Sequence, residues 1–131
     1  MLAIDTNLLI RYITKDVPEL AERVRRFLSE CSERGEPLFI ADSVLCEIAW
    51  VLQRGYRSSR EDIAAELRRL FNSKETRFSS KSRIKIAIEA YANGSSGFAD
   101  YLIREEALEQ GCRAVVTFDK KLLGEEGFME P

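Results

Sequence analysis

The chain has 131 residues, of which 45% are hydrophobic and 32% are charged, and these proportions are ordinary for one globular domain. Its formal net charge is −2, which excludes a uniformly basic nucleic-acid binder but allows a local basic patch. It contains no histidine, and this excludes Ser-His-Asp hydrolysis, Cys-His proteolysis and zinc-histidine sites. Any catalysis therefore has to rest on carboxylates, hydroxyls, lysines, arginines or a hard metal ion.

The opening stretch, MLAIDTNLLIRYI, organises the predicted fold. An apolar run ends in Asp5 and is followed at once by Thr6 and Asn7, which predicts a buried strand over about residues 2–5 and then a helix. Asp5 is then expected at the carboxyl edge of a sheet, where ligands bind in open α/β folds. The alternative is that Asp5 only caps the helix that follows it.

The rest of the chain alternates predicted helices with short strands. Helices are expected over about residues 18–33, 43–55, 58–71, 84–93 and 98–110. Strands are expected at 37–41 and 112–117, with further candidates at 77–78 and 128–129. Ser58 and Glu61 have the spacing of a capping box. Strands separated by helices imply right-handed crossovers, so we expect a single three-layer α/β/α domain over 1–131 with a mainly parallel central sheet flanked by helices.

The sequence carries no membrane or disulfide signature. No apolar run reaches the roughly 18 residues of a membrane span, and the start of the chain lacks the basic region and cleavage pattern of a signal peptide. The three cysteines are widely separated, which is typical of reduced thiols. We therefore expect a cytoplasmic protein.

Glu47 is the second candidate site residue. It falls among apolar residues at helical spacing, between Val44 and Val51. A glutamate on an apolar helix face is usually paired or bound to a metal. The alternative is an internal salt bridge with an arginine such as Arg11.

Asp100 and Asp119 complete the acidic set. Asp100 lies in the first turn of the last helix, where the helix dipole favours an acid, and it shares a helical face with Ile103 and Ala107, which predicts that it points inward. Asp119 follows the apolar strand at 112–117 as Asp5 follows the first strand, so both are expected at the same sheet edge. The alternative for Asp119 is another helix cap.

Several carboxylates that converge cannot all stay ionised unless a cation neutralises them or some take up protons. Ligands that are all oxygen suit Mg²⁺ or Mn²⁺, and such an ion can activate water and bind a phosphodiester. Thr6, Asn7 and Thr117 supply polar groups beside the acids. They are expected to orient ligands or water or, equally, only to cap turns.

Four motifs, IDTNLLIRY, LCEIAWVL, GFADYLI and VVTFDKKL, follow one another along the chain. Together they resemble the PIN-domain family, and the resemblance covers essentially the whole chain. More narrowly, they resemble the VapC-type toxins of toxin–antitoxin pairs. The resemblance implies a ribonuclease that uses one or two Mg²⁺ or Mn²⁺ ions, with Asp5 and Asp100 as the main ligands. Glu47 and Asp119 would hold metal or orient water, and Thr117 matches a hydroxyl residue that often precedes the fourth acid. The implied reaction is in-line attack by metal-bound water on an RNA phosphodiester, leaving 5′-phosphate and 3′-hydroxyl ends.

The same resemblance implies a homodimer and a small antitoxin that covers the early helices and blocks the site. Apolar residues that could serve that interface, or belong to the core instead, are Trp50, Leu52, Tyr56 and Phe71. RNA requires cations around an acidic site. The candidates, each of which could equally lie on a solvated helix face, are Arg11, Lys81, Arg83, Lys120 and Lys121.

Two other functions stay open. One is a non-catalytic RNA- or protein-binding module with the same fold, whose function a chelator would leave unchanged. The other is an aspartyl-phosphate phosphatase with Asp5 as the nucleophile. A haloacid-dehalogenase-type phosphatase would need a second Asp at position 7, where this chain has Asn7.

Overall fold

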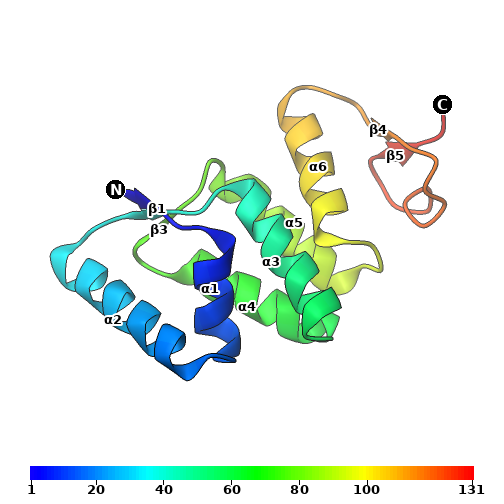
Figure 1. The fold of residues 1–131 in the computed structure, drawn as a ribbon. Coiled ribbons are helices and arrows are strands. Elements are labelled where there is room, and N and C mark those ends of the chain that lie inside the picture. Colours follow the sequence, from blue (N-terminus) through cyan, green and yellow to red (C-terminus); the bar gives the residue numbers. More distant parts are fainter. The chain divides into compact units, whose positions relative to one another are not determined.

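The computed structural model describes all residues, 1–131. The chain forms two compact units, Met1–Ser79 and Ser80–Pro131, and Figure 1 labels most of their elements. Compact units can be parts of one domain, so the expectation of a single domain over 1–131 stays a prediction.

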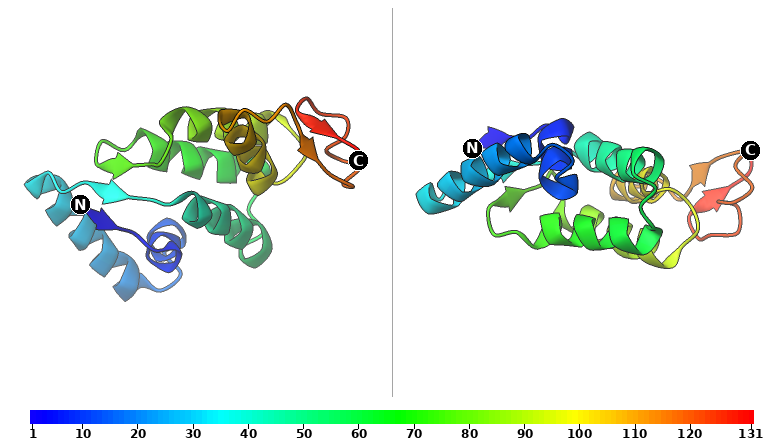
Figure 2. Two further views of the ribbon diagram at one scale, coloured as in Figure 1. Left: turned by 90° about the horizontal axis from the view of Figure 1, so that it is seen from above. Right: turned by 60° about the horizontal axis from the view of Figure 1, so that its bottom comes forward.

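The first unit contains a three-stranded parallel sheet and four helices. In chain order these are β1 (Leu2–Ala3), α1 (Thr6–Thr14), α2 (Pro18–Arg34), β2 (Leu38–Phe39), α3 (Asp42–Gly55), α4 (Arg60–Asn72) and β3 (Thr76–Arg77). The strand order is β1-β2-β3; Leu38 in the central strand is in register with Leu2 and with Thr76. Within this unit α1 and α2 lie on one side of the sheet and α4 on the other (Figure 2). The predicted parallel strands are therefore present.

Local sequence signals explain where these helices begin and end. Pro18 is the first residue of α2, where its missing N–H costs nothing. Gly35 ends α2 in the left-handed conformation (φ 65°), and its N–H donates to the carbonyl groups of Cys31 and Ser32. The apolar side chains between these boundaries form the core of the unit, which includes Ile4, Leu9, Leu38, Ile40, Leu45, Ile48, Ile63 and Leu67.

The predicted capping box of α4 is wrong by one residue. Ser59, not Ser58, caps the helix, since its hydroxyl accepts a hydrogen bond from the N–H of Asp62 at 3.1 Å. The N–H of Ser58 instead donates to the carbonyl of Leu52 at 2.9 Å. This bond ties Ser58 to the end of α3, so the helix starts one residue later.

The second unit contains two packed helices and a pair of short strands. These are α5 (Lys81–Asn93), α6 (Phe98–Glu109), β4 (Val115–Val116) and β5 (Phe128–Met129). The strands pair in parallel, with Val115 opposite Phe128. Tyr91 of α5 meets Phe98 of α6 edge-to-face, with ring centroids 6.0 Å apart. The strand predicted at 112–117 is shorter than expected, and the segment after Asp119 forms turns and no helix.

Arg104 of α6 connects that helix to the end of the chain. Its guanidinium binds the carboxylate of Glu105 at 3.0 Å and the carbonyl of Glu126 at 3.2 Å. It also lies against the rings of Tyr101 and Phe128, 5.4 and 5.9 Å from their centroids. The Arg104–Glu105 pair within α6 is almost fully buried, with side chains 13% and 10% exposed, and it holds the Arg104 guanidinium where that group contacts the Glu126 carbonyl and the Phe128 ring of β5.

Gly127 is required by this contact. Its φ is +89°, a backbone conformation that residues other than glycine rarely adopt. A Cβ at this position would also lie 2.6 Å from Cδ of Arg104. The backbone therefore passes directly against the arginine stem.

The remaining observations concern membrane spans and thiols. No helix of the chain is both long enough and apolar enough to cross a lipid bilayer. None of the cysteines forms a disulfide, and Cys31 is buried, Cys46 half-buried and Cys112 exposed.

Candidate active site

Asp5 occupies the N-cap position of α1 without using its carboxylate as a cap. Its backbone is extended (φ −86°, ψ 159°), as an N-cap requires, but the side chain makes no capping hydrogen bond. It is exposed, and no other hydrogen bond or ion pair engages it. The alternative that Asp5 serves only as a helix cap is therefore wrong, and both carboxylate oxygens are available to a ligand.

Thr6 and Glu47 form a hydrogen bond between α1 and α3. The hydroxyl of Thr6, a residue that is only 7% exposed, donates to Oε2 of Glu47 at 2.6 Å. Glu47 itself is exposed, so the expectation that it faces the apolar core is wrong. The buried face of α3 is formed by Leu45, Ile48, Ala49 and Leu52. Glu47 lies beside that face, where the start of α1 packs against α3.

Asp5 and Glu47 line the same cavity of about 370 Å³ in the first unit. Its other lining residues are Thr6, Asn7, Ile10, Arg11, Val51 and Tyr56. The fold thus brings together four of the predicted site residues of this unit with Arg11. Because α1 begins directly after Asp5 and packs on α3, two carboxylates separated by more than forty positions reach one cavity.

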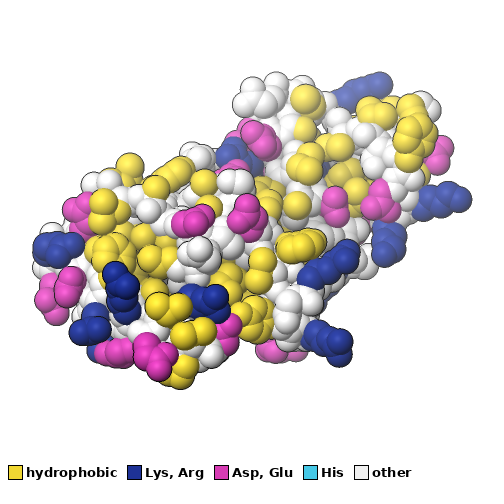
Figure 3. Space-filling model, viewed as in Figure 1, with side chains coloured by type: hydrophobic (Ala, Val, Ile, Leu, Met, Phe, Trp, Pro, Cys, Tyr) yellow, Lys and Arg dark blue, Asp and Glu magenta, His cyan; other side chains and the backbone are white.

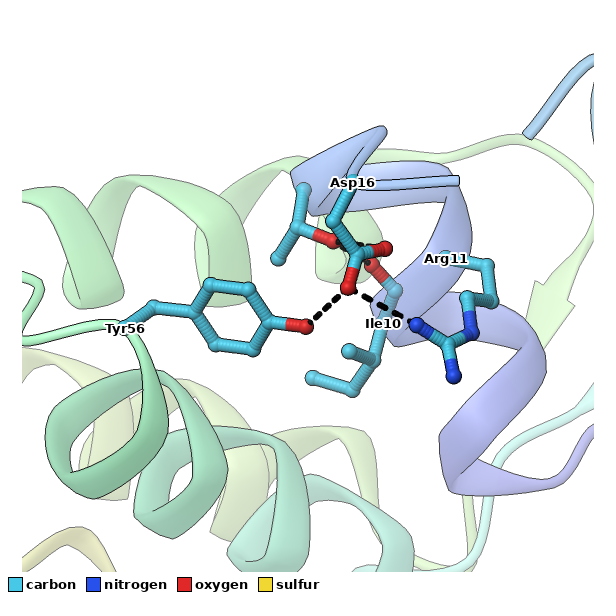
Figure 4. A network of polar contacts seen from close by, with 5 residues as sticks. Ile10, Arg11, Asp16 and Tyr56 are labelled. Carbon is cyan, nitrogen blue, oxygen red and sulfur yellow. Dashed lines mark hydrogen bonds and ion pairs between the residues drawn. The ribbon is translucent and has the colours of Figure 1, made fainter. Parts of the chain in front are cut away.

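Arg11 does not pair with Glu47, so the suggested salt bridge between them is wrong. Its Nη1 donates to Oδ2 of Asp16 at 2.8 Å, and the hydroxyl of Tyr56 donates to the same oxygen at 2.6 Å (Figure 4). Thr14 donates to Oδ1 of Asp16 at 3.1 Å. These bonds, first that of Tyr56 and then that of Arg11, lower the pKa of Asp16 to about 2. From the sequence, Asp16 is expected only near the N-cap of α2, because it lies two residues before Pro18.

Asp100, in the second unit, uses its carboxylate to cap α6. Its Oδ2 accepts the N–H of Gly97 at 3.0 Å. The predicted inward orientation is wrong, because Ile103 on the same face is 53% exposed and Asp100 is half-buried. The buried face of α6 is formed instead by Phe98, Tyr101, Leu102 and Glu105.

Asp119 and Thr117 stabilise the turn after β4. The N–H of Asp119 donates to the hydroxyl of Thr117 at 3.0 Å, and Oδ1 of Asp119 accepts the N–H of Lys121 at 2.9 Å. Asp119 is exposed. Both side chains therefore have a local role in the turn, and their role in a metal site stays a prediction.

The predicted basic residues of the second unit differ in how they are engaged. The guanidinium of Arg83, 10% exposed, is paired with the carboxylate of Glu109. Ser80 also donates to Glu109 at 2.6 Å, and these bonds, that of Ser80 first, hold the pKa of Glu109 below its usual value. Lys81, Lys120 and Lys121 are exposed. Contact of any of them with RNA stays a prediction.

Apolar side chains that were considered for an interface divide into two groups. Trp50 and Tyr56 are 59% and 39% exposed, whereas Leu52 is buried at 3%. Phe71 is half-buried and stacks on Phe78 with ring centroids 5.8 Å apart. Figure 3 shows apolar surface interspersed with acidic and basic side chains on the face drawn.

The donor set of the first unit fits part of a metal site. No group of three or more His, Cys, Asp or Glu side chains lies close enough to hold an ion. Asp5 and one oxygen of Glu47 nevertheless offer unpaired carboxylate oxygens to one cavity, and such hard ligands suit Mg²⁺ or Mn²⁺. Asp100 and Asp119 belong to the other unit, so the set of four acids stays a prediction.

Comparisons with known proteins match nearly the whole chain. The model of the PIN domain family matches residues 2–124. A VapC ribonuclease from Aquifex aeolicus (strain VF5) is 30% identical over 121 residues, which are 92% of this chain and 89% of that protein. The match to the family model spans both units and includes the positions of all four acids.

Proposed function

Because this chain belongs to the PIN-domain family, we propose that it is a metal-dependent endoribonuclease of the VapC toxin type, inhibited by a cognate antitoxin. The family membership confirms the predicted resemblance and the predicted fold class, α/β with parallel strands. The relative named VapC ribonuclease supports a nuclease toxin. The observation that carries the proposal is the unengaged carboxylate of Asp5 in the same cavity as Glu47.

Asp5 and Glu47 would both contribute oxygen ligands to a cation in this cavity. Asp5 offers two free oxygens, and Glu47 offers one while Thr6 holds the other. A hydroxyl that orients a ligating carboxylate in this way fixes its direction before the ion arrives. Asp100 and Asp119 are proposed as further ligands on the basis of the sequence. When bound, one or two Mg²⁺ or Mn²⁺ ions would neutralise the acids, polarise the phosphodiester and make water a nucleophile at neutral pH.

RNA is the proposed substrate, and cationic side chains are proposed to hold its phosphates. Arg11 lines the acidic cavity, so it can bind a phosphate close to the carboxylates. Lys81, Lys120 and Lys121 are exposed in the second unit and are proposed as further contacts. Arg83 would have to exchange its bond with Glu109 for one with a phosphate.

An antitoxin peptide is the proposed inhibitor. A second cavity of the first unit, about 430 Å³, is lined by apolar residues that include Leu28, Ile40 and Leu70 and by Arg25 and Arg69. An amphipathic segment can bury apolar side chains in such a cavity, and its acids would pair with these arginines in place of Glu22 and Glu66. We also propose a homodimer and a cytoplasmic location.

An RNA-cleavage assay with Mn²⁺ and with chelator tests the proposal, with wild type and Asp5→Asn compared. We expect Asp5→Asn to lose at least about a hundredfold in activity, because it removes a charged metal ligand. Asp62→Asn is the matched control, since Asp62 is an exposed acid in the first turn of α4. Equal cleavage by wild type and Asp5→Asn would contradict the assignment.

The two alternatives predict other outcomes. A binding module with the same fold would bind RNA equally well with and without chelator and would leave it uncut. A phosphatase would carry a stable label on Asp5 after treatment with a phosphoryl donor.

A further inference from the structure

Three parts of the first unit meet at one carboxylate. Asp16, in the connection between α1 and α2, accepts bonds from Arg11, Thr14 and Tyr56 at 2.8, 3.1 and 2.6 Å (Figure 4). The hydroxyl of Thr14 also lies 2.8 Å from the carbonyl of Ile10, so these two acceptors share its single proton. Tyr56 follows α3, forty positions along the chain. The network therefore fixes the direction in which Arg11 leaves the end of α1.

The network stands at the rim of the proposed active site. Arg11 and Tyr56 line the same cavity as Asp5 and Glu47. Arg11 also lines a neighbouring cavity of about 480 Å³, whose other residues come from α1 and α2 and include Asn7, Leu20, Arg23 and Phe27. Arg11 thus lines both an acidic cavity and a neighbouring, mainly apolar cavity that contains a second arginine, Arg23.

The bond to Asp16 occupies one nitrogen of Arg11 and leaves the rest of the guanidinium available. An arginine has five N–H donors, and the Arg11 side chain is 38% exposed. If Asp16 released it, the acids that share its cavity are Asp5 and Glu47. An arginine that paired with those acids would compete with a metal ion for them and would no longer be available to bind a phosphate. Asp16, which also accepts the hydroxyl of Tyr56, offers Arg11 a different partner.

We propose that Asp16 and Tyr56 are positioning residues that hold Arg11 at the junction of the two cavities, where its free N–H groups bind a phosphate of the RNA strand. A planar guanidinium with a fixed orientation binds phosphate oxygens in pairs. The RNA backbone then runs from the acidic cavity past Arg11 toward the cavity between α1 and α2. This inference rests on the proposed ribonuclease function and adds the way in which the substrate is held.

The direction in which one substitution changes RNA binding distinguishes this positioning role from a simple effect of charge. Asp16→Asn removes a negative charge, so on charge alone RNA should bind more tightly. If Asp16 positions Arg11, the same substitution weakens RNA binding. The measurement is steady-state cleavage of a short, labelled, single-stranded RNA of mixed sequence at several salt concentrations. Glu19→Gln is the control, because it removes an exposed acid in the first turn of α2.

We expect Asp16→Asn to raise KM for this RNA about tenfold with little change in kcat, as for the loss of one charge-assisted hydrogen bond. The salt slope of log(kcat/KM) should fall by about one, since one phosphate contact is lost. Arg11→Gln should give the same values, and the double variant should be no worse than either single one. Tyr56→Phe, which keeps the ring, should move KM in the same direction by less.

Each outcome decides the inference. An unchanged or lower KM for Asp16→Asn, with wild type still cleaving RNA, overturns the positioning role and leaves the proposed function standing. Failure of wild type to cleave RNA with Mn²⁺ overturns both. If Asp16→Asn melts early, Tyr56→Phe decides, and an unchanged KM in that variant overturns the inference.

Discussion

The acids of the two units differ in what their carboxylates already do. In the first unit Asp5 makes no hydrogen bond and Glu47 accepts one from the hydroxyl of Thr6. In the second unit Asp100 accepts the N–H of Gly97, and Asp119 accepts that of Lys121. Both acids of the second unit therefore stabilise local backbone, whereas Asp5 contributes almost nothing to the fold through its side chain.

Because of this difference, substitutions at these acids should affect the stability of the fold and the activity of the site to different extents. A side chain that makes no contact can be replaced at little cost in folding free energy, which leaves the Asp5 carboxylate free for the ligand proposed above. A side chain that caps a helix has a structural reason to be there whatever else it binds. Four acids that look alike in a sequence can thus be distinguished by the bonds they make, and substitutions at each should affect different quantities.

Thr6→Val should have the largest effect among four tests of this comparison. It removes the hydroxyl that holds Glu47 while keeping the size of a residue that is 7% exposed. We expect a loss of about tenfold to a hundredfold in Mn²⁺ affinity, as is typical when a group that orients a metal ligand is removed. Isothermal titration with Mn²⁺ measures this loss. Thr6→Ser keeps the hydroxyl and should keep the affinity; equal affinities in both variants would contradict the role of this bond.

Gly127→Ala should mainly destabilise the second unit. Its Cβ would lie 2.6 Å from Cδ of Arg104, at a φ of +89°, so we expect a loss of more than about 1 kcal/mol in the free energy of unfolding. Urea denaturation followed by circular dichroism checks the value. The matched control is Gly124→Ala, because no atom lies within 4 Å of a Cβ at position 124 and its φ is not positive.

Replacing Asp5 and Asp100 by alanine should affect stability unequally. Asp100→Ala removes the acceptor of the Gly97 N–H, and loss of such a cap costs about 1 kcal/mol. Asp5→Ala removes no hydrogen bond and should change the free energy of unfolding by less than about 0.5 kcal/mol. Thermal melting of both variants at neutral pH compares them. A larger loss for Asp5→Ala would mean that its carboxylate is engaged after all.

The smallest expected effect is a pH dependence that comes from Asp16. Its bonds to Tyr56 and Arg11 lower its pKa from 3.8 to about 2. A carboxyl whose pKa is depressed in the folded state stabilises the protein fully above the unfolded value, and this contribution is lost as the pH falls from about 4 toward 2. Melting temperatures across that range should therefore fall less steeply in Asp16→Asn than in wild type. Identical slopes would show that the bonds are absent in solution.

Sequence reasoning was most successful where the signal was local. Pro18 and Gly35 mark the ends of α2 correctly, because the missing N–H of proline and the positive φ of glycine act within one turn of helix. It also singled out Asp5 and Glu47, which line one cavity; their role in a metal site stays a prediction, and the inward orientation expected for Glu47 was wrong.

Sequence reasoning failed where tertiary contacts decide which face of a helix is buried. Ile103 suggested that Asp100 points inward, yet Ile103 is exposed while Glu105 of the same helix is buried. Two adjacent charges on a helix are typical of a solvated face, and nothing in their spacing shows that Arg104 and Glu105 pair under the end of the chain. The bond of Arg11 to Asp16 was also missed, since it forms across the end of α1 with the left-handed Lys15 between them.

Trp50 is the one tryptophan of the chain, so its intrinsic fluorescence reports on the first unit alone. It lies on α3 three positions after Glu47, is 59% exposed, and has the guanidinium of Arg54 5.8 Å from its ring centroid. Indole emission depends on solvent and on nearby charge, so cation binding or a protein that covers α3 should shift or quench it. The native chain thus contains its own fluorescent probe on α3, the helix that carries Glu47, and titrations can be followed without a label.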